Sequence, residues 1–342
     1  MRRLFRFEER TRFRLWVWLA AALAAVMLAS AGSALWWLNQ PLKLQSAPLE
    51  VAIEKGKSAR AVVQTLNRAG VQSPPTLLYW WIRLSGHARD IQAGSFEIGR
   101  DTTPRSLLRK LVQGEEIMRS VTLVEGWNMR QVRAALLKAD MLRPDSQAFD
   151  DPGLMAHLGR PGEHPEGHFF PDTYVYAKGS SDLAVLRRAM HVMDQQLELA
   201  WKQRAPDLPL KTPREALILA SIIEKETGFH GERTLISAVF NNRLRIGMML
   251  QTDPTVIYGM GEKFDGNLRK RDLQTDTPWN TYKRAGLPPT PIAMPGKAAL
   301  LAAVKPAKSK ALYFVARGDG TSHFSGSLTE HNRAVNKFQR GQ

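Results

Sequence analysis

The sequence predicts an α+β protein: an N-terminal transmembrane helix, a small α+β module, and a mixed α/β domain that carries a glutamate on a buried helix. Three observations lead to this fold class. An uncharged run of 24 residues lies near the N-terminus, a strand-then-helix pattern occurs twice after it, and a later helix is apolar on nearly every face. With 342 residues, the chain is long enough for two domains of ordinary size.

The uncharged run, residues 15–38, is long enough to cross a membrane as one helix, which takes about 20 residues. Tryptophans stand at both of its ends, as in interfacial belts: Trp16, Trp18, Trp36 and Trp37. Six arginines precede it, so the positive-inside rule predicts a cytoplasmic tail over residues 1–14 and the remaining chain outside. Ala29–Ala31 resembles a signal-peptide cleavage site, but the apolar run continues to Leu38, which favours a retained anchor.

Composition limits the chemistry. The chain has no cysteine, which excludes thiolate catalysis, disulfides and cysteine-ligated metals. The formal net charge of +16 suits an anionic partner, either nucleic acid, anionic lipid or an acidic polymer. Zinc-finger spacings and RNA-binding aromatic motifs are absent from the sequence, so we expect no nucleic acid partner. A charge that serves only solubility remains the alternative.

Residues 39–48 are polar, contain two prolines and are predicted to be a linker. We expect a module over residues 49–118 with five elements: strand 49–53, helix 58–70, aromatic helix 76–84, strand 95–98 and helix 104–112. Its first unit recurs 70 residues later, with Gly126 and Asn128 in place of Gly56 and Ser58. Residues 119–160 therefore form a connecting strand–helix region. Internal similarity and chance recurrence both remain open.

The last region, residues 161–342, is predicted to be the catalytic domain. A loop rich in Pro, Gly and His covers residues 151–167, and an amphipathic helix covers 182–201. A second helix begins at Pro213, after the cap residue Thr212, and continues to about Thr227. Later elements are predicted over residues 238–244 (helix), 311–316 (strand) and the C-terminal end (helix).

Glu224 is the candidate catalytic residue. It lies four residues beyond Ala220 and seven beyond Leu217, and so continues the packed stripe of the apolar helix. Burial would raise the pKa of its carboxyl, as a general acid near neutral pH requires. Glu226 lies about 200° further round the helix. The alternative is that Glu224 only pairs with an arginine.

Polar side chains that suit sugar recognition cluster further along the chain. The candidates are Gln251, Thr252, Asp253, Thr255, Tyr258, Asn280 and Tyr282. Pro254 excludes an uninterrupted helix through the first four of them. We expect no metal and no cofactor. His164, Glu166 and His168 could be considered metal ligands, but they lack the HExxH order, and the Pro and Gly between them argue against a helix.

Several stretches resemble the YceG-like family of endolytic murein transglycosylases. They are EGHFFPDTY (166–174), ASIIEKET (220–227), NRLRIGMMLQTDPTVIYGMG (242–261), NTY (280–282), GLPPTPI (286–292) and HNRAV (331–335). The resemblance covers the anchor and residues 49–338. It implies a single-pass inner-membrane protein with a LysM-like module, a periplasmic catalytic domain, and Glu224 as the catalytic glutamate.

By this resemblance, the protein cleaves the MurNAc–GlcNAc β-1,4 bond within nascent glycan strands without water. It leaves 1,6-anhydroMurNAc ends and terminates strand elongation. The implied partners are peptidoglycan glycan strands, the inner membrane and peptidoglycan synthases (penicillin-binding proteins). Three alternatives remain open: a glycan-binding scaffold without catalysis, a metallohydrolase built on His164 and His168, and hydrolysis by Glu224 together with an acid such as Asp253.

Overall fold

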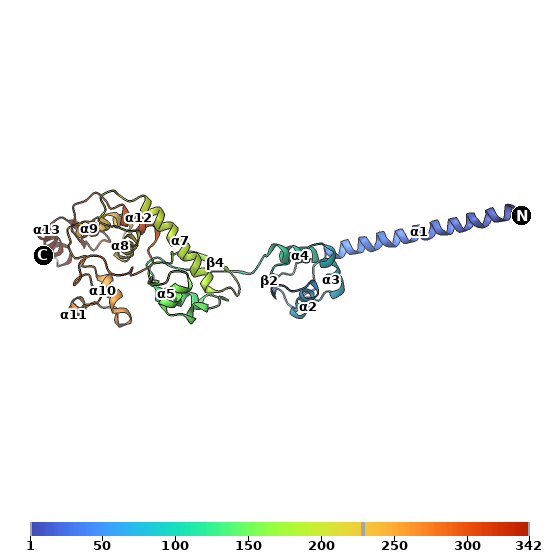
Figure 1. The fold of residues 1–342 in the computed structure, drawn as a ribbon, viewed down its shortest axis with the longest axis horizontal. Helices are drawn as coiled ribbons and strands as arrows, with labels where there is room; N and C mark the ends of the chain where they lie inside the picture. The colour runs from blue at the N-terminus through green and yellow to red at the C-terminus, as the bar shows by residue number, and fades with distance from the viewer. Residues whose placement is uncertain (1, 227–229, 341–342) are drawn as a thin grey trace. The chain divides into compact units, whose positions relative to one another are not determined.

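The computed structural model describes residues 2–226 and 230–340, which belong to two compact units, Met1–Met118 and Arg119–Gln342 (Figure 1). The first unit begins with a long helix, α1 (Arg2–Leu38). Within it, Trp16–Leu38 is long and apolar enough to cross a membrane, and none of this stretch is buried inside the protein. The single predicted N-terminal apolar helix is therefore present.

The rest of the first unit has the predicted order of elements: β1 (Leu49–Ile53), α2 (Ala59–Ala69), α3 (Pro75–Leu84), β2 (Gly94–Ile98) and α4 (Pro104–Gln113). The two strands pair antiparallel, with Leu49 opposite Ile98. Alternate residues of β1 face the core. Residues 39–48, predicted to be a linker, run along this module: Leu42 is buried and its N–H donates to the Thr102 carbonyl at 2.8 Å.

The recurring strand–turn–helix unit has the same local geometry in both places. In the module, Ser58 accepts from the N–H of Ala61 at the start of α2. In the second unit, Asn128 accepts from the N–H of Gln131 at the start of α5 (Met129–Lys138). The glycine two residues before each cap, Gly56 or Gly126, has φ near +78°, a conformation that favours glycine. The predicted caps are confirmed.

The second unit is mostly helical. In chain order, the further elements are β3 (Met118–Thr122), η1 (Asp145–Ala148), α6 (Asp151–His157), β4 (Thr173–Ala177), α7 (Asp182–Lys202), α8 (Pro213–Glu226), η2 (His230–Glu232), α9 (Arg233–Arg245), α10 (Asp253–Met260), η3 (Gly261–Lys263), α11 (Lys270–Gln274), α12 (Lys297–Val304), β5 (Tyr313–Ala316), β6 (Ser322–Ser325) and α13 (Leu328–Gln339). Strand β3 pairs with β4, and β5 pairs antiparallel with β6.

One loop of the sequence prediction is partly helical. Residues 151–167 include α6, because the Asp150 carboxylate accepts from the Gly153 N–H and Pro152 stands in the first turn, where its missing N–H costs nothing. Pro254 likewise stands in the first turn of α10. The polar group around it therefore begins a helix.

Helix α8 lies at the centre of the second unit, where it packs against α7, α9, α10 and α12. Residues 216–223 are all buried, as the apolar sequence predicts. A second core is built from β3, α5, α6, β4 and the first half of α7. The core around α8 contains Ile292, and the second core contains Met294. The loop before α12 carries both residues and therefore joins the two cores beside the end of α8.

Candidate active site

Glu224 lies in the last turn of α8, with its side chain only 7% exposed. Oε2 accepts a hydrogen bond from the Gly296 N–H at 2.9 Å, at the start of α12. The Arg233 guanidinium at the start of α9, itself 9% exposed, lies 3.5 Å from Oε1. Both contacts stabilise the ionised carboxylate. Glu224 does pair with an arginine, as one alternative held, and the main-chain contact also fixes its direction.

The loop before α5 lies against Glu224. Two backbone hydrogen bonds join this loop to Met294: Gly126 N–H to Met294 O at 2.9 Å, and Met294 N–H to Trp127 O at 2.7 Å. A Cβ on Gly126 would stand 3.9 Å from Glu224 Cγ. The Glu125 carboxyl packs so closely against Gly296 that a Cβ there would overlap it. The glycine turn was visible in the sequence, but its nearness to Glu224 was not.

Glu226 is directed at other elements than Glu224. Its carboxylate accepts from the Thr252 hydroxyl, just before α10. Burial raises the pKa of Glu226, and the Thr252 hydrogen bond opposes that shift. The two glutamates of this turn therefore have separate surroundings, as their angular separation predicts.

The predicted sugar-binding side chains divide into two groups. Thr252, Thr255 and Asn280 are at most 2% exposed. Thr255 Oγ1 donates to the Thr252 carbonyl at 2.7 Å, and Asn280 Nδ2 donates to the Thr275 carbonyl at 2.6 Å. These three side chains hold the chain around the start of α10 and present almost no surface to a ligand.

Gln251 and Asp253 are exposed, and Tyr282 is half-buried. The Tyr282 hydroxyl donates to Asp253 Oδ1 at 2.6 Å. Burial raises the pKa of Tyr282, and its bond to Asp253 adds to that shift. Of the predicted group, these three therefore remain able to contact a ligand from this side of α10, with Tyr258 facing elsewhere.

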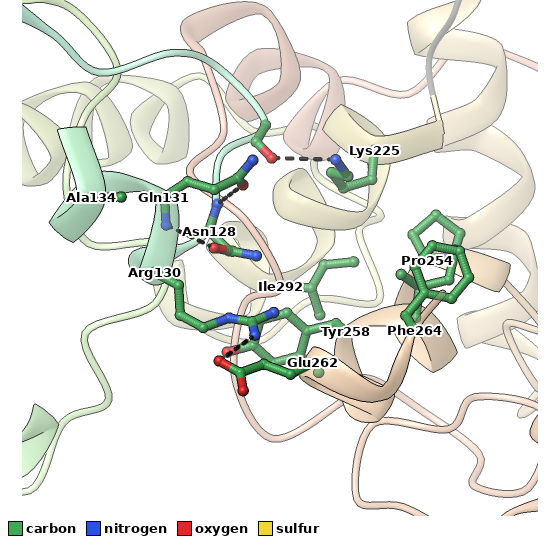
Figure 2. A pocket seen from close by; sticks show the side chains of 13 residues that line it. Asn128, Arg130, Gln131, Ala134, Lys225, Pro254, Tyr258, Glu262, Phe264 and Ile292 are labelled. Atoms are coloured by element: carbon green, nitrogen blue, oxygen red, sulfur yellow. Dashed lines mark hydrogen bonds and ion pairs between the residues drawn. The ribbon is translucent and has the colours of Figure 1, made fainter. Parts of the chain in front are cut away.

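Tyr258 lines a pocket of about 720 Å³, and Lys225, the residue that follows Glu224, lines the same pocket. Figure 2 shows the start of α5 on one side of this pocket and α10 with Phe264 on the other. None of the other predicted sugar-binding residues lines it. The lining residues are Gly126, Asn128, Arg130, Gln131, Ala134, Lys225, Pro254, Ile257, Tyr258, Gly261, Glu262, Phe264 and Ile292.

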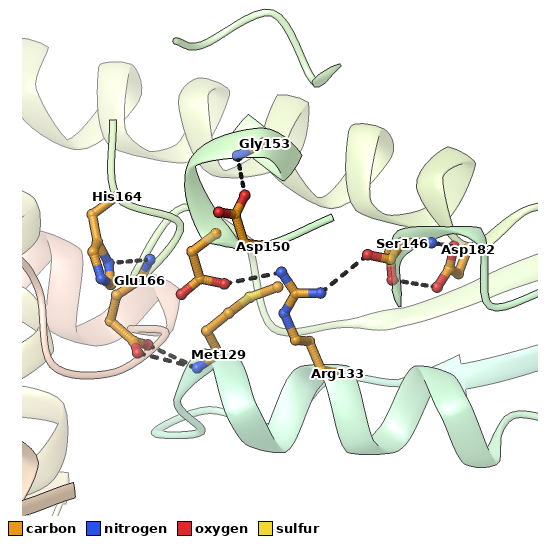
Figure 3. A network of polar contacts seen from close by, with 9 residues as sticks. Met129, Arg133, Ser146, Asp150, Gly153, His164, Glu166 and Asp182 are labelled. Atoms are coloured by element: carbon orange, nitrogen blue, oxygen red, sulfur yellow. Dashed lines mark hydrogen bonds and ion pairs between the residues drawn. The ribbon is translucent and has the colours of Figure 1, made fainter. Parts of the chain in front are cut away.

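A buried carboxyl ties the two walls of this pocket together, and Figure 3 shows its contact with the first turn of α5. Glu166 is 2% exposed and accepts from the Met129 N–H at 3.1 Å, in the first turn of α5. It also accepts from the Tyr258 hydroxyl of α10 at 3.0 Å. Burial raises the pKa of Glu166 to about 7, against the lowering effect of both hydrogen bonds. Glu166 begins the EGHFFPDTY stretch, but its contact with Tyr258 cannot be predicted from the sequence.

The two histidines beside Glu166 lie in different surroundings. His164 Nδ1 accepts from the Glu166 N–H at 3.2 Å. Burial lowers the pKa of His168 to about 4. Among the described residues, no group of three or more His, Cys, Asp or Glu side chains is placed to hold a metal ion.

Comparison with known proteins places this arrangement in a family. The model of the YceG-like family matches residues 51–337. The chain belongs to the YceG-like family. The resemblance drawn from the sequence motifs is thereby confirmed.

Relatives of this chain include the endolytic murein transglycosylase of Bacillus subtilis, which is 30% identical over 88% of each chain. The endolytic murein transglycosylase of Streptococcus pneumoniae R6 is 25% identical over 83% of this chain and 57% of its own length. A yceG-like protein from Listeria monocytogenes has a crystal structure that matches 83% of this chain and 98% of its own, with a TM-score of 0.55 and 27% identity.

Proposed function

We propose that this protein is an endolytic murein transglycosylase in which Glu224 is the catalytic acid and base. The observation that carries the proposal is the position of Glu224. It is the only carboxylate of α8 that faces the Gly126 loop and the start of α12, and it does so in a chain of the YceG-like family. The names of the relatives supply the substrate, murein.

The reaction needs one carboxyl group. Protonated Glu224 gives its proton to the glycosidic oxygen between MurNAc and GlcNAc as the bond from that oxygen to the anomeric carbon breaks. The 6-hydroxyl oxygen of the same muramyl ring then bonds to that carbon and its proton passes to the Glu224 carboxylate. The product is a 1,6-anhydroMurNAc end, and no water is consumed. Arg233 and the Gly296 N–H stabilise the carboxylate between the two steps.

A hydrolase would need a second carboxylate at the same site to activate water. Glu226 is engaged by Thr252, and Asp253 by Tyr282, so both have partners on the α10 side. The partners of Glu224 come instead from the starts of α9 and α12, and this separation supports the single-carboxylate reaction over hydrolysis by Glu224 with Asp253.

The finer assignments are part of the same proposal. Helix α1 anchors the protein in the inner membrane with residues 1–14 in the cytoplasm and the second unit in the periplasm. The strand–helix–helix–strand order of residues 49–98 supports a LysM-like glycan-binding module. An enzyme that ends growing strands works beside the synthases that extend them, so peptidoglycan synthases are the expected partners.

The test is the mass of the products. Full-length protein in detergent is incubated with uncross-linked glycan strands, and the released fragments are weighed by mass spectrometry. Anhydro ends are lighter by one water than hydrolysed ends. Fragments with hydrolysed ends would mean that the protein is a hydrolase and not a lyase. Intact strands would mean that it is a glycan-binding scaffold without catalysis.

A further inference from the structure

The pocket beside Glu224 carries positive charge that a glycan chain does not require. Lys225 follows the catalytic residue directly, and its Nζ lies 3.3 Å from the Gly126 carbonyl. Arg130, on the opposite wall, is 3.3 Å from the Glu262 carboxylate (Figure 2). The side chains of Arg130 and Glu262 are 54% and 87% exposed, so their ion pair is weak and open to exchange for another carboxylate.

The face of the pocket formed mainly by α10 is apolar. Ile257, Tyr258 and Pro254 come from α10, and Phe264 and Ile292 complete this face. A volume of about 720 Å³ is in the range of sites that hold small organic ligands. A ligand that carries carboxylates as well as short alkyl groups matches the charged and the apolar parts of the pocket together.

The walls of the pocket are fixed in place. Glu166 joins the first turn of α5 to Tyr258 of α10 through the bonds described above. The Tyr258 ring packs edge-on against Trp279 at 5.4 Å between ring centres, and Trp279 Nε1 donates to Thr290 at 2.9 Å. These contacts hold Tyr258 from two sides, so the pocket is a built cavity.

We propose that this pocket binds the carboxylate-bearing peptide carried by the muramyl residue whose bond Glu224 breaks. The peptide hangs from C3 of the ring, two atoms from the anomeric carbon, so it must leave the sugar close to Glu224. Its carboxylates pair with Arg130 and Lys225, and its methyl and methylene groups face Ile257 and Phe264. The proposal rests on the function proposed above and makes the enzyme selective for strands that still carry peptides.

The experiment compares two substrates with full-length protein in detergent. One is uncross-linked strands with intact peptides, and the other is the same strands after an amidase has removed the peptides, which leaves the lactyl carboxylate in place. We expect wild-type kcat/KM to be higher for the peptide-bearing strands. Arg130→Gln should reduce this preference roughly tenfold, since it removes one charge-assisted contact. The matched control is Arg143→Gln, an exposed arginine paired with Asp145 outside the pocket, which should keep the preference.

Equal cleavage of both substrates by the wild type would overturn the proposal, as would an equal loss on both for Arg130→Gln. Binding is measured in parallel with the Glu224→Gln variant and fluorescent strands of both kinds. If peptide-bearing strands bind more tightly in an Arg130-dependent way while the wild type cleaves neither substrate, this result would support the peptide-binding pocket and refute the proposed catalysis.

Discussion

At the scale of single residues, the two glutamates in the last turn of α8 have different hydrogen-bond partners. Glu224 is held by the main-chain N–H of Gly296 and by the buried Arg233 guanidinium, and both contacts favour its charged form. Glu226 is held by a hydroxyl, and burial raises its pKa. The contacts of Glu224 stabilise the carboxylate that forms once its proton has been given to the glycosidic oxygen.

Glu224→Gln should abolish cleavage and leave the fold intact. The amide oxygen can still accept from the Gly296 N–H, but the side chain has no acidic proton to give. Loss of a general acid costs about 10²–10⁴-fold in rate, and loss of the base step in the same residue places the effect at the upper end. Glu226→Gln is the control, because its amide still accepts from Thr252, and most activity should remain. Product release by a Glu224→Gln protein that melts like the parent would make Glu224 structural.

Arg233→Gln tests the buried ion pair. It leaves the Glu224 carboxylate in a poorly solvated site without its guanidinium partner, so the free energy of unfolding should fall by about 2 kcal/mol. In Glu224→Gln, the same Arg233 substitution should cost clearly less, because the negative charge is gone. Urea unfolding of the four proteins in this cycle gives the coupling energy. Strictly additive losses would mean that the pair contributes nothing.

At the scale of elements, Glu166 links α5 to α10. The groups that face its carboxyl are Met129 N–H, the Tyr258 hydroxyl, Asp151 and Arg130, with His164 bonded to its own N–H. Since burial is the largest influence, the folded protein holds a proton on Glu166 that the unfolded chain releases near pH 4.5.

The folded pKa of about 7 lies above the unfolded value of 4.5, so the folded state binds more protons between these limits. This contribution to stability is therefore complete below pH 4.5 and is lost as pH rises through 7. Glu166→Gln keeps the hydrogen-bonding shape but cannot ionise, so its melting temperature should fall less than that of the wild type between pH 5 and 8. Thermal melts of both proteins at several pH values measure the difference. Parallel curves would mean that Glu166 does not titrate in this range.

The module presents its own basic hollow, between the loop after β1 and the loop before β2. Lys57, Arg60, Arg83 and Arg89 are among its lining residues. If the module helps to hold the anionic polymer, replacing Arg83 and Arg89 by Ser should lower co-sedimentation with purified sacculi severalfold. Arg100→Ser with Arg105→Ser, two exposed arginines outside the hollow, is the matched control. Equal retention by both variants would argue against binding at this place.

At the scale of the whole molecule, charge and hydrophobicity are distributed as in a single-pass anchor. Residues 1–14 carry six arginines against two glutamates, and the apolar helix follows directly. We expect protease added to spheroplasts to digest the second unit and to leave a short fragment protected by the membrane. A second unit that survives until the cells are lysed would reverse the proposed orientation.

What the sequence alone determined were the features set by local chemistry. The length of the uncharged apolar run predicts the apolar part of α1. Cap residues such as Ser58 and Asn128 predict where helices begin. The apolar stretch before Glu224 predicts a helix that other elements cover on all sides. The YceG-like motifs are equally readable, because they are contiguous. Local pattern failed where proline stood in a first turn, since Pro152 lies at the start of a helix in a segment whose composition predicted a loop.

Only the tertiary structure decided which distant residues meet. Arg233 and Gly296 lie 9 and 72 positions from Glu224, and nothing in their spacing announces the contact. Glu166 reaches Met129 and Tyr258 in the same way, across 37 and 92 positions. Burial separated the predicted sugar-binding group, because a hydroxyl or amide can serve a ligand or the chain itself. Packing decides which: Thr255 and Asn280 satisfy the backbone around α10, whereas Asp253 stays exposed.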